Sequence, residues 1–239
     1  MDLSALPTAG ELSPNGIRSA RWTPELPCAL HSEIFACGNE GAGAAAALAL
    51  ARVRIREAKE RNVLWIQDAE SLRRTGRPYR LGLPSDLRHR LIHVAARKPE
   101  DALFALEEGL RCRELACVIG EIAGNPRALD FTASRRLSLM AEKHGVPLFL
   151  VRLDAARDLS SARMRWQVRS APSLPPRWNA DAPGSPAWRA ELFRSRAHPP
   201  AVWILRDDNE VIAAEPLPAS APDHGDLAAA AGDRSLAAY

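Results

Sequence analysis

Short apolar runs alternate with longer segments of helical periodicity through the first two thirds of the chain. Five runs are typical of buried strands, and they span 32–36, 63–66, 91–94, 116–121 and 147–151. The segments between several of them predict helices, because their apolar residues recur three and four positions apart or their ends carry capping residues. These helices cover 43–61, a segment that begins at Pro99, and a segment from about 130 to 144. Such alternation predicts βαβ units and a mostly parallel sheet covered on both faces.

The pattern changes after Val151. Three further strand-like segments, 165–170, 188–195 and 201–206, are separated by proline-rich loops with no helical segment between them, which predicts an antiparallel β extension. The predicted organisation is therefore an irregular leader, one α/β domain and a tail. The leader covers 1–29, the domain covers 30–206 with its core to about 152 and its β extension at 163–206, and the acidic, mostly disordered tail covers 207–239.

Composition narrows the class of protein only slightly. The 239 residues are 46% hydrophobic and carry a formal charge of +3, which indicates a globular protein and does not by itself indicate nucleic-acid binding. The charge is divided, however: residues 152–206 contain ten arginines against four acidic residues, and 207–239 contain seven acidic residues against one arginine. The four cysteines form no CxxC pair, so no metal site is expected. With no signal peptide and no long apolar run, we expect a cytoplasmic protein without membrane contact.

One segment has the spacing of a phosphate-binding loop without its chemistry. Gly38 and Gly43 stand at the two glycine positions of the pattern GxxxxGK[ST], directly after the first strand. Ala44 and Ala45 replace the lysine that would neutralise phosphates and the hydroxyl that would hold Mg²⁺. Backbone N–H groups at a helix start still attract anions weakly. We therefore predict a degenerate loop with no bound cofactor and no efficient nucleotide hydrolysis.

The order of the elements resembles a RecA-type core, and two carboxylates add to the resemblance. Asp68-Ala69-Glu70 follows the second strand, where RecA-like ATPases carry a catalytic glutamate, and Glu70 takes that position. Glu121 ends the fourth strand, where the Walker B carboxylate stands. Carboxylates without the phosphate and metal contacts suggest a pseudo-enzyme. The fold expected is thus a RecA-like P-loop core followed by the antiparallel extension.

A closer resemblance is to the ImuA family, the RecA-like accessory proteins of bacterial error-prone translesion synthesis. It extends over roughly 30–207, and its most specific blocks are 105–111, 129–137, and 160–166 with 171–173. Residues 186–192 and 194–196 also resemble the family. The resemblance implies a non-catalytic role in damage-induced mutagenesis and the SOS response. It implies ImuB, an error-prone C-family DNA polymerase and RecA as partners. The leader and the tail show no such match.

Two other functions remain open from the sequence. The first is a RecA-class, DNA-dependent ATPase in which Lys59, Lys98, Lys143 or a neighbouring subunit completes the loop. The second is a DNA-binding module without nucleotide chemistry, because arginines interleaved with tryptophans can bind phosphates and stack on bases. Large aromatic residues on strands more often belong to the core. The candidate partner or DNA surface consists of Arg163, Arg165, Trp166, Trp188, Arg194 and Arg196.

Overall fold

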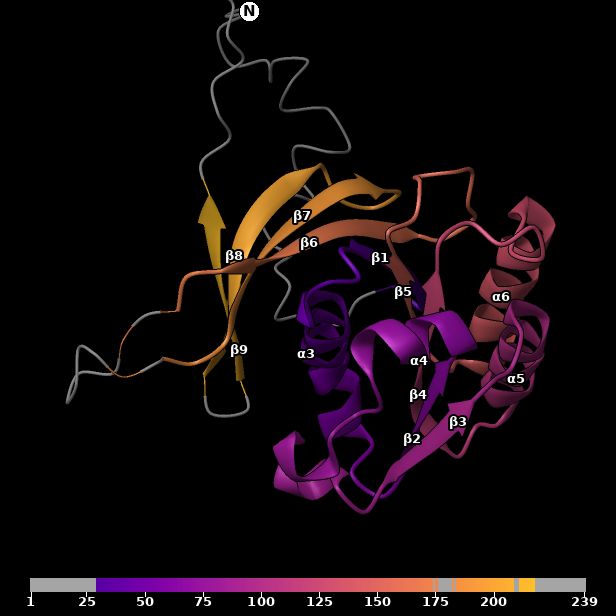
Figure 1. Ribbon diagram of the computed structural model, residues 1–239, viewed down its shortest axis with the longest axis horizontal. Helices are drawn as coiled ribbons and strands as arrows, with labels where there is room; N and C mark the ends of the chain where they lie inside the picture. The colour runs from indigo at the N-terminus through magenta and orange to yellow at the C-terminus, as the bar shows by residue number, and fades with distance from the viewer. Residues whose placement is uncertain (1–28, 174, 176–181, 183, 209–210, 218–239) are drawn as a thin grey trace, which may run out of the picture.

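Nine strands form one continuous sheet in the order β3-β2-β4-β5-β1-β6-β7-β8-β9 (Figure 1). The computed structural model describes residues 29–173, 175, 182, 184–208 and 211–217. The strands are β1 His31–Ala36, β2 Asn62–Gln67, β3 Leu91–Ala95, β4 Leu115–Ala123, β5 Leu148–Leu153, β6 Met164–Ala171, β7 Ala187–Ser195, β8 Ala201–Asp208 and β9 Val211–Leu217. The pairs from β3 to β6 are parallel, and the pairs from β6 to β9 are antiparallel.

Four α-helices connect the parallel strands. They are α3 Ala42–Glu57, α4 Ala69–Thr75, α5 Pro99–Arg111 and α6 Phe131–His144, with 3-10 turns at Arg80–Gly82 and Ser85–Leu87. Local chemistry sets their ends. Pro99 stands in the first turn of α5, and Asp130 caps α6 by accepting a hydrogen bond from the Ala133 N–H at 2.7 Å. Gly145, in the left-handed conformation with φ 71°, ends α6.

Two apolar clusters cover the two faces of the sheet. On one face, α3 packs on the central strands and against β6 to β8, which arch over it in Figure 1. On the other face, α5 and α6 pack side by side over β2, β4 and β5. The central strands β4 and β5 are buried along their whole lengths, because helices cover both of their faces.

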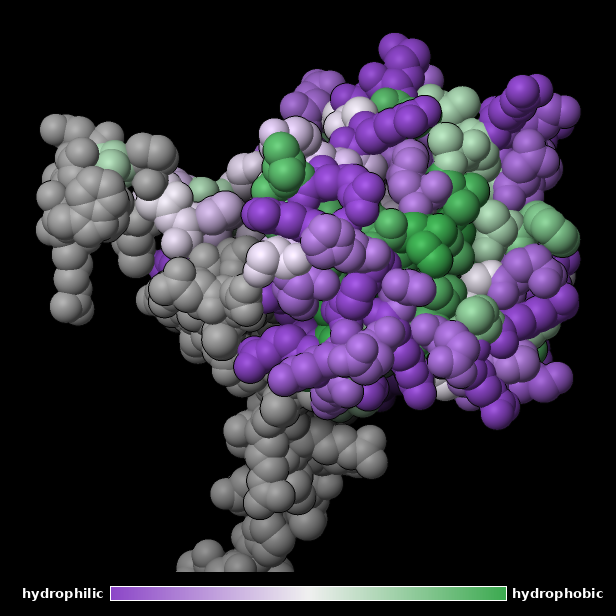
Figure 2. Space-filling view, turned by 90° about the horizontal axis from the view of Figure 1, so that it is seen from below, coloured by the Kyte–Doolittle hydropathy of each residue, from purple (hydrophilic) through white to green (hydrophobic). Residues whose placement is uncertain are grey.

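The underside of the molecule in Figure 1 is the end at which α3 finishes and β2 begins. Figure 2 shows this face as largely hydrophilic, with an area of hydrophobic side chains near its centre. Within the described residues, no helix is both long enough and apolar enough to cross a membrane.

The mixed α/β fold, the five parallel strands and the antiparallel end agree with the sequence prediction. Three features differ. The helix α4 was not predicted, and it forms because the Asp68 side chain accepts a hydrogen bond from the Ser71 N–H at 2.7 Å and caps it. Strand β6 pairs in parallel with β1, so the extension continues the main sheet. The first part of the segment predicted as a tail forms strand β9, because it pairs with β8 along seven positions. The leader up to residue 28 and the tail beyond 217 lie outside the described residues.

Candidate functional site

The loop between β1 and α3 holds the two glycines of the degenerate motif. The helix begins at Ala42, so Gly43 lies in its first turn, directly against the sheet. A Cβ atom on Gly43 would stand 2.7 Å from the Ala36 Cβ and 2.8 Å from a methyl carbon of Val151. Only glycine permits this approach without displacing the helix. Gly43 therefore has a packing role that needs no ligand.

The N–H of Gly38 is already bound by a carboxylate of the protein itself. It donates to Oδ1 of Asp154 at 3.0 Å. Oδ2 of Asp154 pairs with the guanidinium of Arg74 from α4. Asp154 directly follows β5 and has a φ of 49°, a left-handed conformation that Asp tolerates better than most residues. An internal anion thus stands at the first glycine of the loop, where a phosphate-binding loop would receive an external one.

Glu70 is held by two arginines on its own helix. Its carboxylate accepts hydrogen bonds from Arg73 at 2.6 and 2.9 Å and from the Arg74 Nε at 2.7 Å. The Arg73 and Arg74 hydrogen bonds lower the pKa of Glu70 to about 2. A carboxylate of such low basicity is a poor proton acceptor for an attacking water. Arg74 contacts both Glu70 and Asp154, so the structure does bring the Glu70 segment to the loop. Both carboxylates are ion-paired there, and neither is free to act as a general base.

Glu121 lies inside the protein. It is 1% exposed, and its carboxylate accepts hydrogen bonds from Trp65 Nε1 at 2.6 Å and Thr75 Oγ1 at 3.0 Å. Burial raises the pKa of Glu121, while these hydrogen bonds oppose the shift. Its two oxygens join β4 to β2 and to the end of α4. In this position the carboxylate links neighbouring elements of the fold, and donors of the protein itself occupy both of its oxygens.

A cavity of about 360 Å³ lies beside the loop, at the carboxyl ends of β1 and β5 and along β6. Its polar lining includes Glu40, Asp154, Gln167 and Arg169. The Glu40 carboxylate accepts a hydrogen bond from the Ser170 N–H at 3.1 Å. Two carboxylates at this position oppose a polyphosphate. Together with Ala44 and Ala45, these residues do not fit a nucleoside triphosphate with its magnesium ion.

The three lysines considered as substitutes are spread over the fold. Lys59 follows α3, whose 16 residues place it roughly 24 Å from the loop. Lys143 lies in the last turn of α6, which returns the chain to the start of β5, at the opposite end of the sheet. Lys98 precedes α5 beyond the outer strand β3, four strand positions from β1 and thus roughly 19 Å away.

The six residues proposed as a partner or DNA surface divide into two groups. Arg165, Trp166 and Trp188 are 3%, 0% and 6% exposed, so the prediction that they form a surface is wrong. The tryptophans belong to the core beside α3, because β6 and β7 bend over that helix. The other three, Arg163, Arg194 and Arg196, are partly or fully exposed, and their contact with a partner stays a prediction.

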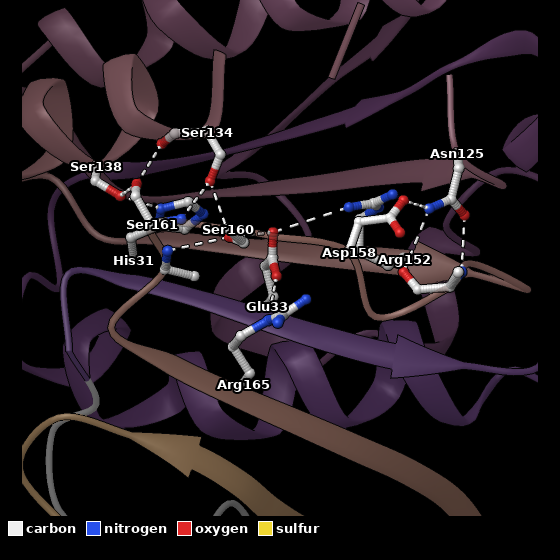
Figure 3. A network of polar contacts seen from close by, with 12 residues as sticks. His31, Glu33, Asn125, Ser134, Ser138, Arg152, Asp158, Ser160, Ser161 and Arg165 are labelled. Atoms are coloured by element: carbon white, nitrogen blue, oxygen red, sulfur yellow. Dashed lines mark hydrogen bonds and ion pairs between the residues drawn. The ribbon is translucent and has the colours of Figure 1, made fainter. Parts of the chain in front are cut away.

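Arg165 belongs to a buried polar network centred on Glu33 of β1 (Figure 3). Glu33 is 0% exposed, and its Oε2 accepts a hydrogen bond from Arg165 Nε at 2.8 Å. Its Oε1 accepts from Ser160 Oγ at 2.8 Å and lies 3.8 Å from Arg152 Nη1. Burial lowers the pKa of Arg152, and the Glu33 charge opposes that shift. The network neutralises a carboxylate that would otherwise be very costly to bury.

Serine hydroxyls extend this network to α6. Ser134 contacts Ser160 at 2.8 Å, and Ser138 contacts Ser161 at 2.5 Å (Figure 3). His31 of β1 contacts Ser138 Oγ at 2.7 Å, and burial lowers the pKa of this histidine to about 4. The segment between β5 and β6 is thereby fixed to both α6 and β1. It therefore lies against β1 on the side of the sheet where α6 packs.

The sequence interpretation did not find Asp154, Arg74 or the Glu33 network. Glu33 carried one usable signal: a charged residue inside a strand with buried neighbours requires a buried partner of opposite charge. Its partners Arg152 and Arg165 follow more than a hundred residues later, and only the pairing of β1 with β5 and β6 brings them close. Arg74 and Asp154 carried no signal, because they lie in connections whose path depends on the whole sheet.

The fold and the loop define an α/β protein with a parallel core whose phosphate-loop-like turn binds its own aspartate. The chain is 36% identical over 166 residues to Protein ImuA of Caulobacter vibrioides, in strain NA1000 / CB15N and equally in strain ATCC 19089 / CIP 103742 / CB 15. The match covers 64% of this chain and 65% of each relative, slightly less than two thirds of their length. No protein-family model matches the chain. The identity to these relatives supports assignment of the chain to the ImuA family.

Proposed function

We propose that this protein is a non-catalytic, RecA-like accessory factor of damage-induced mutagenesis. The observation that supports its non-catalytic nature best is the hydrogen bond from Gly38 to Asp154. The loop of an ATPase must keep its N–H groups for phosphate, whereas this N–H is bound to a carboxylate that Arg74 holds in place. Ala44 and Ala45 offer neither ammonium nor hydroxyl. The alternative of a RecA-class ATPase finds no supporting lysine near the loop.

The RecA-like part of the proposal is supported by the place of the loop in the sheet. Ligands of open α/β sheets bind at the carboxyl ends of the strands, where neighbouring connections leave toward opposite faces. The loop lies at such a point, because α3 leaves β1 toward one face and the segment after β5 covers the other. Glu70 and Glu121 lie near the same ends of β2 and β4. This arrangement supports the proposal of a RecA-like edge in which internal ion pairs and hydrogen bonds take the place of nucleotide contacts.

The role in mutagenesis and the partners rest on the family. In this proposal the protein acts in the cytoplasm in error-prone translesion synthesis and assembles with ImuB, an error-prone C-family polymerase and RecA. Its contribution is then to bring proteins together, since its own site lacks the groups for phosphoryl transfer. DNA would be reached through these partners or directly through exposed arginines of the extension.

A complementation experiment tests the proposal. A strain lacking the gene is expected to show fewer mutations after ultraviolet damage, with unchanged growth in the absence of damage. The wild-type chain and Glu70→Gln should both restore the induced mutations, because Glu70 has no catalytic task. Glu60→Gln, at another exposed glutamate, is the matched control. An unchanged mutation frequency in the deletion strain would contradict the role, and failure of Glu70→Gln alone would favour the ATPase.

A second experiment tests assembly. The tagged chain is captured from damaged cells, and its partners are identified by mass spectrometry. We expect ImuB, the polymerase or RecA among the proteins retained by both the wild-type chain and Glu70→Gln. Capture of none of the three would remove the assembly role.

A further inference from the structure

Three blocks of sequence that lie far apart in the chain meet at one cleft. The cleft has a volume of about 240 Å³ and lies between α6, the segment before β6 and the chain just after β7. Phe131, Arg135 and Leu139 contribute from α6, and Arg163 and Arg196 contribute from the other two segments. These positions fall in or beside the blocks 129–137, 160–166 and 186–196, on which the resemblance to the ImuA family rests.

The apolar part of the cleft is exposed. Phe131, Arg135 and Leu139 are four residues apart and therefore share one face of α6. The exposed fractions of Phe131 and Leu139 are 46% and 53%. Leu159, two residues before the cleft residue Ser161, is 77% exposed. Phe131 and Leu139 thus form an exposed apolar wall of the cleft, and exposed apolar patches are typical of a surface that binds another protein.

The charged part of the cleft is basic. Glu142 pairs with Arg163 at 2.5 and 2.6 Å and neutralises it. Among the described residues, no carboxylate forms an ion pair with Arg135 or Arg196, and both side chains are exposed. The cleft therefore presents apolar side chains flanked by two positive charges that nothing in this part of the chain balances.

The walls of the cleft are fixed before any partner arrives. Ser138 and Ser161 line it, are nearly fully buried, and contact each other at 2.5 Å. The Ser161 N–H donates to Ser134 Oγ at 3.0 Å, and the Arg196 N–H donates to the Arg163 carbonyl at 3.3 Å. A preformed site avoids the entropy that ordering a loop would require on binding.

We propose that this cleft docks a short acidic peptide segment of a partner protein, with one large apolar side chain held between Phe131 and Leu139. Acidic residues beside that side chain would pair with Arg135 and Arg196. The inference deepens the proposed function and rests on it, because an assembly factor requires a docking surface. Single-stranded DNA is the less favoured occupant, because Phe131 is the one aromatic side chain among the residues that line the cleft and Leu139 offers no face for a second stacked base.

The test begins with the purified chain and a phage-displayed library of random 12-residue peptides. We expect enrichment of sequences that combine Asp or Glu with Leu, Phe or Trp. The best such peptide is then synthesised with a fluorescent label, and its affinity is measured by anisotropy. Two variants probe the cleft: Arg135→Glu/Arg196→Glu for its charge and Leu139→Ser for its apolar part. Each should weaken peptide binding about tenfold or more. In the charge variant, peptide affinity should also depend less on salt concentration than it does in the wild-type chain.

Matched controls separate the cleft from general effects. Arg97→Glu/Arg113→Glu reverses two exposed arginines elsewhere, and Leu81→Ser removes an exposed leucine that is 65% accessible. Both controls should bind the peptide as the wild-type chain does. Thermal melting should be nearly unchanged in all four variants, because the altered side chains are exposed. A cleft variant that unfolds would be replaced by Arg135→Gln or Leu139→Ala before binding is compared.

Several outcomes would overturn the inference. No enrichment of acidic peptides, or equal loss of affinity in cleft and control variants, would exclude the cleft as the docking site. A labelled 20-nucleotide single strand that competes with the peptide and loses affinity only in the charge variant would assign the cleft to DNA. The peptide experiment measures affinity and does not depend on the frequency of induced mutations in cells. A failed peptide test beside a positive deletion phenotype would therefore leave the proposed function intact, and the reverse result would leave the cleft intact.

Discussion

Asp154 accepts a hydrogen bond from the Gly38 N–H at 3.0 Å and so places a carboxylate at the first glycine of the degenerate loop. The same carboxylate pairs with Arg74, which also binds Glu70. One arginine thereby satisfies two acidic groups that would otherwise repel each other and any phosphate. The consequence is that the acidic groups at this edge of the sheet are paired within the protein itself.

The first prediction concerns nucleotide chemistry. The purified chain should show no ATP hydrolysis above background, with or without single-stranded DNA, and 1 mM ATP with Mg²⁺ should not raise its melting temperature. Ala44→Lys/Ala45→Thr should stay inactive, because Asp154 still binds the loop N–H. Phosphate release and melting curves are the measurements. Turnover that Glu70→Gln abolishes would show that the site is catalytic.

The second prediction concerns packing at the loop. Gly43→Ala should lower the free energy of unfolding by about 1–3 kcal/mol, because its Cβ would lie within 2.8 Å of Ala36 and Val151. Gly41→Ala is the matched control, since a Cβ there meets nothing within 4 Å and its φ of −77° suits alanine. The control should change stability by less than about 0.5 kcal/mol. Urea denaturation measures both, and equal effects would contradict the close approach of α3.

The third prediction concerns the buried ion pair. Glu33→Gln should destabilise the fold by about 3–5 kcal/mol, because it leaves the Arg165 guanidinium buried without its counter-charge. Glu33→Gln/Arg165→Met should recover part of that loss. The exposed pair of Arg136 with Glu107 offers the control, and Arg136→Gln should cost less than about 1 kcal/mol. Chemical denaturation of the four proteins gives the comparison; a double variant as unstable as the single one would remove the charge explanation.

The fourth prediction concerns pH. The pKa of His31 is lowered by burial from 6.5 to about 4, so the unfolded chain binds this proton at a higher pH than the folded one. Its contribution to stability is complete above pH 6.5 and falls as the pH drops toward 4, by up to about 3 kcal/mol. His31→Asn should flatten the pH dependence of unfolding in that window. His89→Gln, at an exposed histidine, should leave it unchanged. Parallel curves for wild type and His31→Asn would refute the assignment.

The sequence predicted the strands well because their apolar runs are short and bounded by capping and turn residues. For α6, the sequence offered Asp130 or Thr132 as the cap and Gly145 as the stop, and the structure has Asp130 and Gly145 at the two ends. The short helix α4 was missed because its seven residues carry too little periodicity to distinguish them from a polar loop. The partners of Asp154, Gly38 and Arg74, are decided by loop paths that local patterns do not contain.

The candidate site shows the same division. The strand-to-helix turn with its two glycines could be predicted from one local motif, whereas its relation to a phosphate-binding loop stays a prediction. The burial of Trp166 and Trp188 could not, because it depends on how far β6 and β7 bend over α3. Alternating arginine and tryptophan look alike on an exposed face and on a strand with one buried face. The packing around the sheet decides which of these residues are buried, and of Arg165 and Trp166 both are.

The parallel pairing of β6 with β1 bears on how truncated forms of this protein behave. A chain ended after β5 would lose Arg165 and Ser160, two partners of the buried Glu33. It would also leave β1 as an unpaired edge beside the core, where an open edge invites aggregation. Such a shortened chain would therefore lose partner binding through collapse of the sheet as well as through the absence of the cleft residues Arg163 and Arg196. Interaction mapping in this protein therefore requires point substitutions within the intact sheet.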